Sequence, residues 1–221
     1  MKTFKSIVLI LSLFLSIGYT LMLVHTVGGF DLNQTAERFF SFGFVCFIPL
    51  WLFLRNKTSF YATFEHEFTH LIVGLLFLKK PGDFRATERA GGYTSLYGSN
   101  FVISLAPYFL PTLVFLLLPL HLWLDVGYYR YYFVVLGFLT AYHIFSTWDE
   151  FGFHQTDITK HGKLFSCSFI LFGNIFSYGV LLAFIIGGFR YSWIFIRDGF
   201  FASFEIVSYV GMALANFVQQ M

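Results

Sequence analysis

The chain has 221 residues, of which 57% are hydrophobic and only 12% are charged, and its mean hydropathy is +0.70. Soluble domains carry about a quarter charged residues, so this composition excludes an ordinary soluble protein and predicts an all-α polytopic membrane protein that resides in a lipid bilayer. The net charge of +2, without a Lys/Arg cluster, excludes nucleic acid as a partner.

Apolar segments of the length that a bilayer requires, about 20 residues, recur along the chain. The first follows two lysines, but it continues to about Val27 without a small-residue cleavage site, so we expect a retained helix and not a signal peptide. We expect six or seven transmembrane helices in a single domain of residues 1–221. The expected spans are Ile7–Val27, Phe39–Leu54, Ser59–Leu78, Phe101–Leu120, Tyr131–Thr147, Leu164–Gly187 and Phe200–Val218.

The segment Lys79–Asn100 is the longest stretch without apolar character. It contains a Pro-Gly pair, the pair Gly91-Gly92 and a Tyr-Thr-Ser-Leu-Tyr run that is typical of strands. We therefore expect a short β-hairpin that is re-entrant or lies beside the membrane.

The helix expected at 59–78 carries the motif His66-Glu67-x-x-His70. Residues four apart lie on one face of a helix, so the two imidazoles can hold one metal ion, and Zn²⁺ suits nitrogen ligands. Glu67, next to the first ligand, is placed to take a proton from metal-activated water as general base and to return it as general acid.

The membrane setting strengthens this interpretation. An ionisable side chain at the centre of a bilayer costs about 2.5–3.5 kcal/mol, so several of them on consecutive turns need a compensating partner such as a cation. The alternative is an interfacial helix with its polar half among the lipid headgroups and no bound metal. Glu65, just before the motif, is either a group that orients a ligand imidazole or an interfacial charge.

Three sequences resemble the site-2 protease family of intramembrane zinc metalloproteases, in particular its compact bacterial branch. "FEHEFTHLIVGLL" is an HExxH at the head of an apolar helix, "GGYTSLYGSN" is similar to the family's hairpin beside the active site, and "NFVISLAPYFLPTL" is similar to the start of its next span. The resemblance covers about a quarter of the chain, and only the HExxH is specific. It implies a multi-pass protein of the bacterial cytoplasmic (inner) membrane.

The family takes its third metal ligand from an Asp within an Asn-x-x-Pro and Asp-Gly motif, which this chain lacks at the corresponding distance. Three residues remain open for this role. Asp157 lies at the family's spacing and is the ligand that we expect; Asp149 ends a span, and His143 lies within one. To reach His70, a loop Asp would need a broken or re-entrant backbone that is shielded from lipid.

Substrate contacts are expected along the hairpin, where an edge strand can pair with an unwound peptide. The residues expected to bind substrate are Gly92, Tyr93, Thr94 and Asn100. For Asn100, capping of the helix that begins at Phe101 is the alternative role.

These observations predict a membrane-embedded zinc endopeptidase that cuts membrane protein or peptide substrates in or near the bilayer. A non-proteolytic metal-binding scaffold or transporter that keeps the HExxH helix is the first alternative, and the missing third-ligand motif is its support. A histidine-rich membrane oxidase is a second alternative, but His66 and His70 form the only HxxxH pair in the sequence. The sequence leaves the oligomeric state open.

Overall fold

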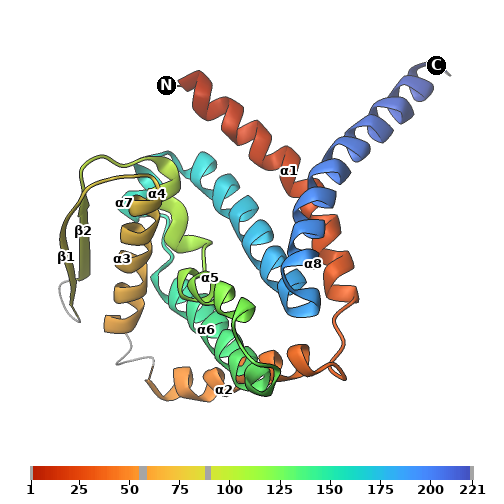
Figure 1. Ribbon diagram of the computed structural model, residues 1–221. Helices are drawn as coiled ribbons and strands as arrows, with labels where there is room; N and C mark the ends of the chain where they lie inside the picture. The colour runs from red at the N-terminus through yellow and green to blue at the C-terminus, as the bar shows by residue number, and fades with distance from the viewer. Residues whose placement is uncertain (1, 55–58, 88–90, 220–221) are drawn as a thin grey trace. The chain divides into compact units, whose positions relative to one another are not determined.

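The computed structural model describes residues 2–54, 59–87 and 91–219, which are mostly helical with one two-stranded sheet (Figure 1). Short 3-10 helices (η) interrupt the α-helices in the middle of the chain. The elements in chain order are α1 (Lys2–Gly28), α2 (Thr35–Leu54), α3 (Ser59–Leu76), β1 (Pro81–Thr87), β2 (Gly91–Leu96), α4 (Phe101–Leu105), η1 (Ala106–Tyr108), α5 (Thr112–Leu117), η2 (Leu118–Leu122), η3 (Val126–Tyr128), α6 (Tyr129–Glu150), α7 (Thr156–Thr159) and α8 (Lys163–Gln219).

The chain forms two compact units, one of Met1–Phe30 with Leu171–Met221 and the other of Asp31–Ile170. A single domain over residues 1–221 stays a prediction. The metal-binding motif and the hairpin both belong to the unit of Asp31–Ile170, whereas the other unit consists of the two ends of the chain.

In the unit of the chain ends, α8 reverses direction at Gly187 and Gly188, whose backbone is not helical (Figure 1). Gly188 has φ 65° and ψ −159°, a region that is essentially restricted to glycine. The Ser192 hydroxyl donates to the Val180 carbonyl across the bend at 3.1 Å, so the two halves pack against each other. The predicted spans Leu164–Gly187 and Phe200–Val218 thus lie on the two arms of α8.

Among the described residues, three helices are long and apolar enough to cross a membrane. They are Thr3–Gly28, Thr35–Phe53 and Lys163–Ile206, and the bent pair Phe101–Tyr108 with Thr112–Leu122 adds a fourth if it counts as one span. The six or seven spans that the sequence predicts are therefore not confirmed.

The span predicted at Phe101–Leu120 is not one straight helix. The chain bends by 94° between Phe101–Tyr108 and Thr112–Leu122. Pro107 and Pro111 flank this bend, and each removes a backbone donor that a continuous helix would use. The Ile103 carbonyl, before the bend, meets His70 of α3.

Glycines allow α2 and α6 to approach closely in the unit of Asp31–Ile170. A Cβ on Gly43 would lie 2.0 Å from the Val134 carbonyl oxygen, and a Cβ on Gly137 would lie 1.9 Å from that of Phe40. Small residues bring helix backbones together in this way within membranes. This contact sets the position of α6, whose last turn reaches the metal-binding motif.

The predicted β-hairpin is present, with β1 and β2 paired antiparallel and Arg85 opposite Tyr93. It lies beside α3 (Figure 1). Alternate residues of β2 face the helix, because strand side chains alternate between faces: Gly92 lies against Glu67, the Thr94 hydroxyl donates to the Glu67 carbonyl, and Leu96 lies against Gly74. The hairpin thus runs along the helix that carries the HExxH motif.

Candidate metal centre

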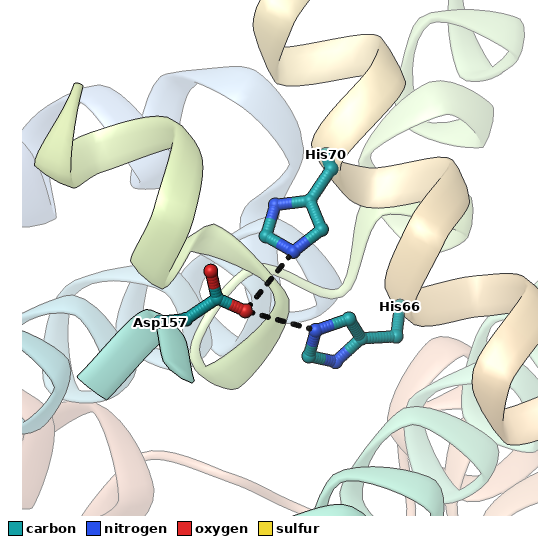
Figure 2. A group of neighbouring side chains, drawn as sticks. All are labelled: His66, His70 and Asp157. Atoms are coloured by element: carbon teal, nitrogen blue, oxygen red, sulfur yellow. Dashed lines mark ion pairs between the residues drawn. The ribbon is translucent and has the colours of Figure 1, made fainter. Parts of the chain in front are cut away.

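His66 and His70 extend from one face of α3 towards Asp157 on α7 (Figure 2). The Asp157 Oδ2 atom lies 3.6 Å from His66 Nε2 and 3.4 Å from His70 Nε2. All three side chains are partly buried, with 12–25% of each exposed. The structure therefore brings together the two histidines of the motif and the acidic residue that the sequence analysis favours.

Asp157 reaches the histidines because the chain after α6 folds back in a short turn. The side-chain amide of Gln155 donates to the Glu150 backbone carbonyl at 2.9 Å, and Ile158 is fully buried beneath the turn. The Ser166 hydroxyl donates to the Ile158 carbonyl at 3.0 Å, which ties α7 to the start of α8. The four-residue helix α7 is thus fixed at both ends, and it is the broken backbone that an Asp in this loop needs to reach His70.

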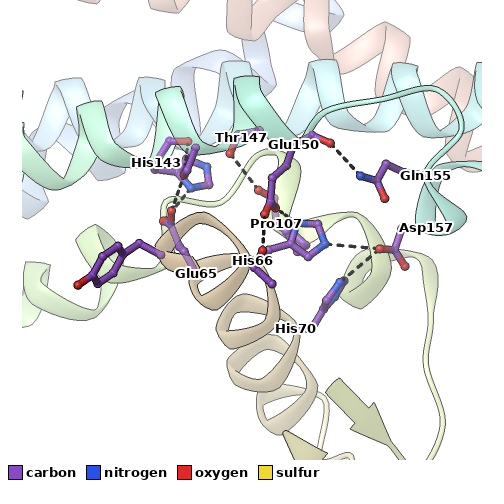
Figure 3. Close-up of polar contacts among 12 residues, drawn as sticks. Glu65, His66, His70, Pro107, His143, Thr147, Glu150, Gln155 and Asp157 are labelled. Carbon is purple, nitrogen blue, oxygen red and sulfur yellow. Dashed lines mark hydrogen bonds and ion pairs between the residues drawn. The ribbon is translucent and has the colours of Figure 1, made fainter. Parts of the chain in front are cut away.

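The partner of Nδ1 in each histidine determines which ring nitrogen carries the hydrogen, and thus what Nε2 presents to Asp157. His70 Nδ1 lies 2.8 Å from the Ile103 carbonyl oxygen, which can only accept, so Nδ1 carries the hydrogen. His66 Nδ1 lies 3.1 Å from a carboxylate oxygen of Glu150, which also only accepts, so this Nδ1 carries a hydrogen as well (Figure 3). In the neutral rings, each Nε2 therefore presents its lone pair to Asp157.

Three acceptor atoms that face one another repel unless positive charge lies between them, as imidazolium protons or as a metal ion. The ligand atoms of His66, His70 and Asp157 lie within 4.8 Å of one another. Zinc bonds of 2.0–2.2 Å in a tetrahedron place neighbouring ligand atoms about 3.4 Å apart. The separations from Asp157 Oδ2 match this value, and the two-nitrogen, one-oxygen donor set is one that catalytic zinc uses, so the residues fit a zinc ion.

The histidines also determine the charge of Asp157. Burial alone would raise the pKa of this carboxyl, but when both rings are protonated, hydrogen bonds and positive charge from His66 and His70 outweigh burial and hold the pKa well below its usual range. Asp157 is therefore an ionised carboxylate, the form in which aspartate binds metal.

Glu67 follows the first histidine and lies between α3 and the hairpin. A Cβ on Gly92 would come within 2.4 Å of Glu67 Cγ and 2.8 Å of its Oε1 atom. Only a residue without a side chain therefore allows β2 to pass Glu67 so closely. The predicted base is thus partly buried and lies against the hairpin.

Of the other predicted substrate-binding residues, Tyr93 and Thr94 lie within β2 and Asn100 lies just before α4. Tyr93 faces away from α3 and is 57% exposed, whereas Thr94 is held by its bond to the Glu67 carbonyl. The Asn100 side chain accepts from the Ile103 amide at 2.9 Å and caps α4. The capping role of Asn100 is therefore confirmed, and substrate contacts by these residues stay predictions.

The two alternative third ligands have other partners. The exposed Asp149 accepts a hydrogen bond of 3.1 Å from the Trp51 indole. His143 is buried, and its Nδ1 atom lies 2.9 Å from Glu65, which also accepts from the Ser146 hydroxyl at 2.8 Å (Figure 3). Glu65 thus bonds His143 and not a histidine of the motif.

Glu150 lies against the candidate site, and the sequence analysis did not anticipate it. One of its oxygens lies 3.1 Å from His66 Nδ1, and the other accepts from the Thr63 hydroxyl at 3.1 Å. A carboxylate on the outer nitrogen of a ligand histidine fixes the ring and raises its basicity. Only the helical period could have signalled the residue: Glu150 falls four residues after Ser146 and seven after His143, on the face of α6 that meets α3.

Comparison of the chain with protein-family models, with curated proteins and with solved structures finds no match. Within residues 2–54, 59–87 and 91–219, His66, His70 and Asp157 are the one group of three or more His, Cys, Asp or Glu side chains placed to share an ion. The function therefore has to be argued from this site.

Proposed function

We propose that this chain is a membrane-embedded zinc metalloendopeptidase that cleaves membrane-associated proteins or peptides in or near the bilayer. The observation that carries the proposal is the convergence of His66, His70 and Asp157, with Glu67 next to the first histidine. Three helices long and apolar enough to cross a membrane support the location.

The protein's own residues supply ligands, a base and a place for substrate. His66, His70 and Asp157 would hold the ion, which when bound polarises a carbonyl and lowers the pKa of a water. Glu67 would accept a proton from the attacking water and donate it to the leaving amine. Glu150 and the Ile103 carbonyl hold the two imidazoles in the tautomer that ligation needs.

The hairpin offers a way to bind an extended substrate. β1 and β2 form a two-stranded sheet, so each strand has an edge without a strand neighbour in the described part of the chain. A transmembrane substrate must unwind locally before its backbone can pair with such an edge, because helical backbone groups are bonded internally. Pairing beside Gly92 would bring the peptide next to Glu67.

Bound metal in detergent-purified protein is the first test. We expect stoichiometric zinc in the wild type and in Asp149→Asn, and its loss in His70→Ala and Asp157→Asn. Asp149→Asn is the matched control, because this carboxylate bonds Trp51 and not the site. Well-folded wild type without zinc, under conditions that retain tightly bound metal, would end the proposal.

Glu67→Gln separates a peptidase from a metal-binding scaffold. This variant is expected to keep its zinc but to lose the hydrolysis of fluorescein-labelled casein, used as a general probe in detergent. If both proteins retain zinc and hydrolyse casein equally, or if the wild type retains zinc but hydrolyses no casein, the scaffold or transporter is favoured.

A further inference from the structure

A second site lies beside the metal centre, in the unit of Asp31–Ile170. A cavity of about 440 Å³ is bounded by α2, α3, α5 and α6. Its walls include Phe47 and Leu50 of α2, Phe64 of α3, Leu113 of α5 and Leu139 of α6. Volumes of this order are typical of sites for small organic ligands.

The polar side chains inside the cavity are bonded to the protein, whereas Tyr61 lies at its exposed rim. The Ser146 hydroxyl donates to Glu65, Asp149 accepts from the Trp51 indole, and the Tyr142 hydroxyl donates to the Tyr61 carbonyl. A ligand would meet aromatic faces and aliphatic chains, and a polar ligand would lose its hydrogen bonds with water without replacement. The walls of the cavity therefore favour an apolar hydrocarbon ligand over a polar one.

The rim of the cavity indicates where that hydrocarbon comes from. Leu50 and Tyr61 line it and are exposed, and Phe53, on the same helix as Leu50, is 85% exposed. α2 is one of the helices long and apolar enough to cross a membrane. Trp51 and Asp149 also lie on the cavity, near the C-terminal ends of α2 and α6. A tryptophan paired with a charge at a helix end is typical of the membrane–water interface, where lipid acyl chains begin.

We propose that this cavity binds one acyl chain of a bilayer phospholipid, whose headgroup stays at the rim formed by Trp51 and Asp149. The inference rests on the proposed membrane location but not on peptidase activity. A peptide segment is the other candidate occupant. It suits the cavity less well, because its backbone amides and carbonyls would find their possible partners already bonded.

The test counts the phospholipids that remain on the protein after extensive detergent exchange, by mass spectrometry of the intact protein. Leu113→Trp fills the cavity from α5, and Leu116→Trp places the same side chain on the exposed side of that helix. We expect one retained phospholipid per chain in the wild type and in Leu116→Trp, and its loss in Leu113→Trp. Wild type without a retained phospholipid, or equal retention in both variants, would overturn the proposal.

A second measurement needs no variant and does not depend on how Leu113→Trp folds. Wild-type protein in vesicles of phosphatidylcholine is crosslinked to a phosphatidylcholine that carries a photoreactive group within its acyl chain. We expect adducts on cavity residues such as Phe47 and Leu139. Adducts confined to outward residues such as Phe42 and Leu116 would show only surrounding lipid and refute the site. Zinc content is measured on the same samples, so failure of the metal site and failure of the lipid site are distinguishable.

Discussion

At the scale of single residues, the candidate metal centre depends on what lies behind its ligands. The Glu150 carboxylate and the Ile103 carbonyl each accept from a ring nitrogen, of His66 and His70 respectively, and thereby fix both rings. Such partners determine the basicity of a ligand as well as its direction.

Glu150→Gln tests this role. The variant keeps the shape of the side chain and an oxygen acceptor but removes the charge that raises the basicity of His66. We expect zinc affinity to fall by about 10- to 100-fold, measured by competition with a chelator of known affinity. The matched control is Asp149→Asn, which removes the neighbouring charge that bonds Trp51. Equal affinity in the two variants would contradict the role.

At the scale of elements, the site depends on how closely α6 packs against its neighbours. Gly43 and Gly137 let the backbones of α2 and α6 meet. The last turn of α6 then presents Glu150 to His66, while His143 of the same helix meets Glu65. A helix displaced from α2 would move both contacts at once.

Gly137→Ala is therefore expected to be costly. The added Cβ would lie 1.9 Å from the Phe40 carbonyl oxygen, a backbone atom that can move only with its helix. Overpacking of this kind costs about 1–3 kcal/mol of stability, so the thermal midpoint in mild detergent should fall. Gly127→Ala, where a Cβ would meet nothing within 4 Å, should leave the midpoint unchanged. Similar midpoints for the two variants would show that α2 and α6 do not depend on this contact.

At the scale of the whole molecule, the proposed ion would join segments that are far apart in the chain. α3 supplies two ligands, and α7, about ninety residues later, supplies the third. A ligand that binds only the folded state stabilises that state by an amount that grows with its concentration relative to its Kd. The bound ion is thus expected to stabilise the unit of Asp31–Ile170.

Metal removal should therefore lower thermal stability. At free zinc 1,000 times the Kd, the stabilisation amounts to about 4 kcal/mol, and a chelator should abolish it. The measurement is the unfolding transition of the wild type in mild detergent with and without chelator. His70→Ala, which loses a ligand, should show no such shift. An equal shift in both proteins would mean that the chelator acts elsewhere.

The sequence by itself determined the local features. A period of 3.6 residues places His66 and His70 on one side of α3, and glycine and strand-forming residues place a hairpin at 79–100, because both depend on neighbours in the chain. Apolar length identified α1, α2 and α8 as potential membrane helices, but the further spans that it predicted are not confirmed. Length and composition show that a segment is able to cross a bilayer, and they do not show that its chain runs straight.

Only the tertiary structure decided which distant side chains meet. Asp157, Asp149 and His143 were all chemically suitable, and the fold-back at α7 with the packing of α6 gave each a different partner. For the same reason, the carboxylate that meets a motif histidine is that of Glu150, whereas Glu65 meets His143. Contacts between α3 and residues about ninety positions later result from how several separate elements pack together, and no local pattern in the sequence specifies that packing.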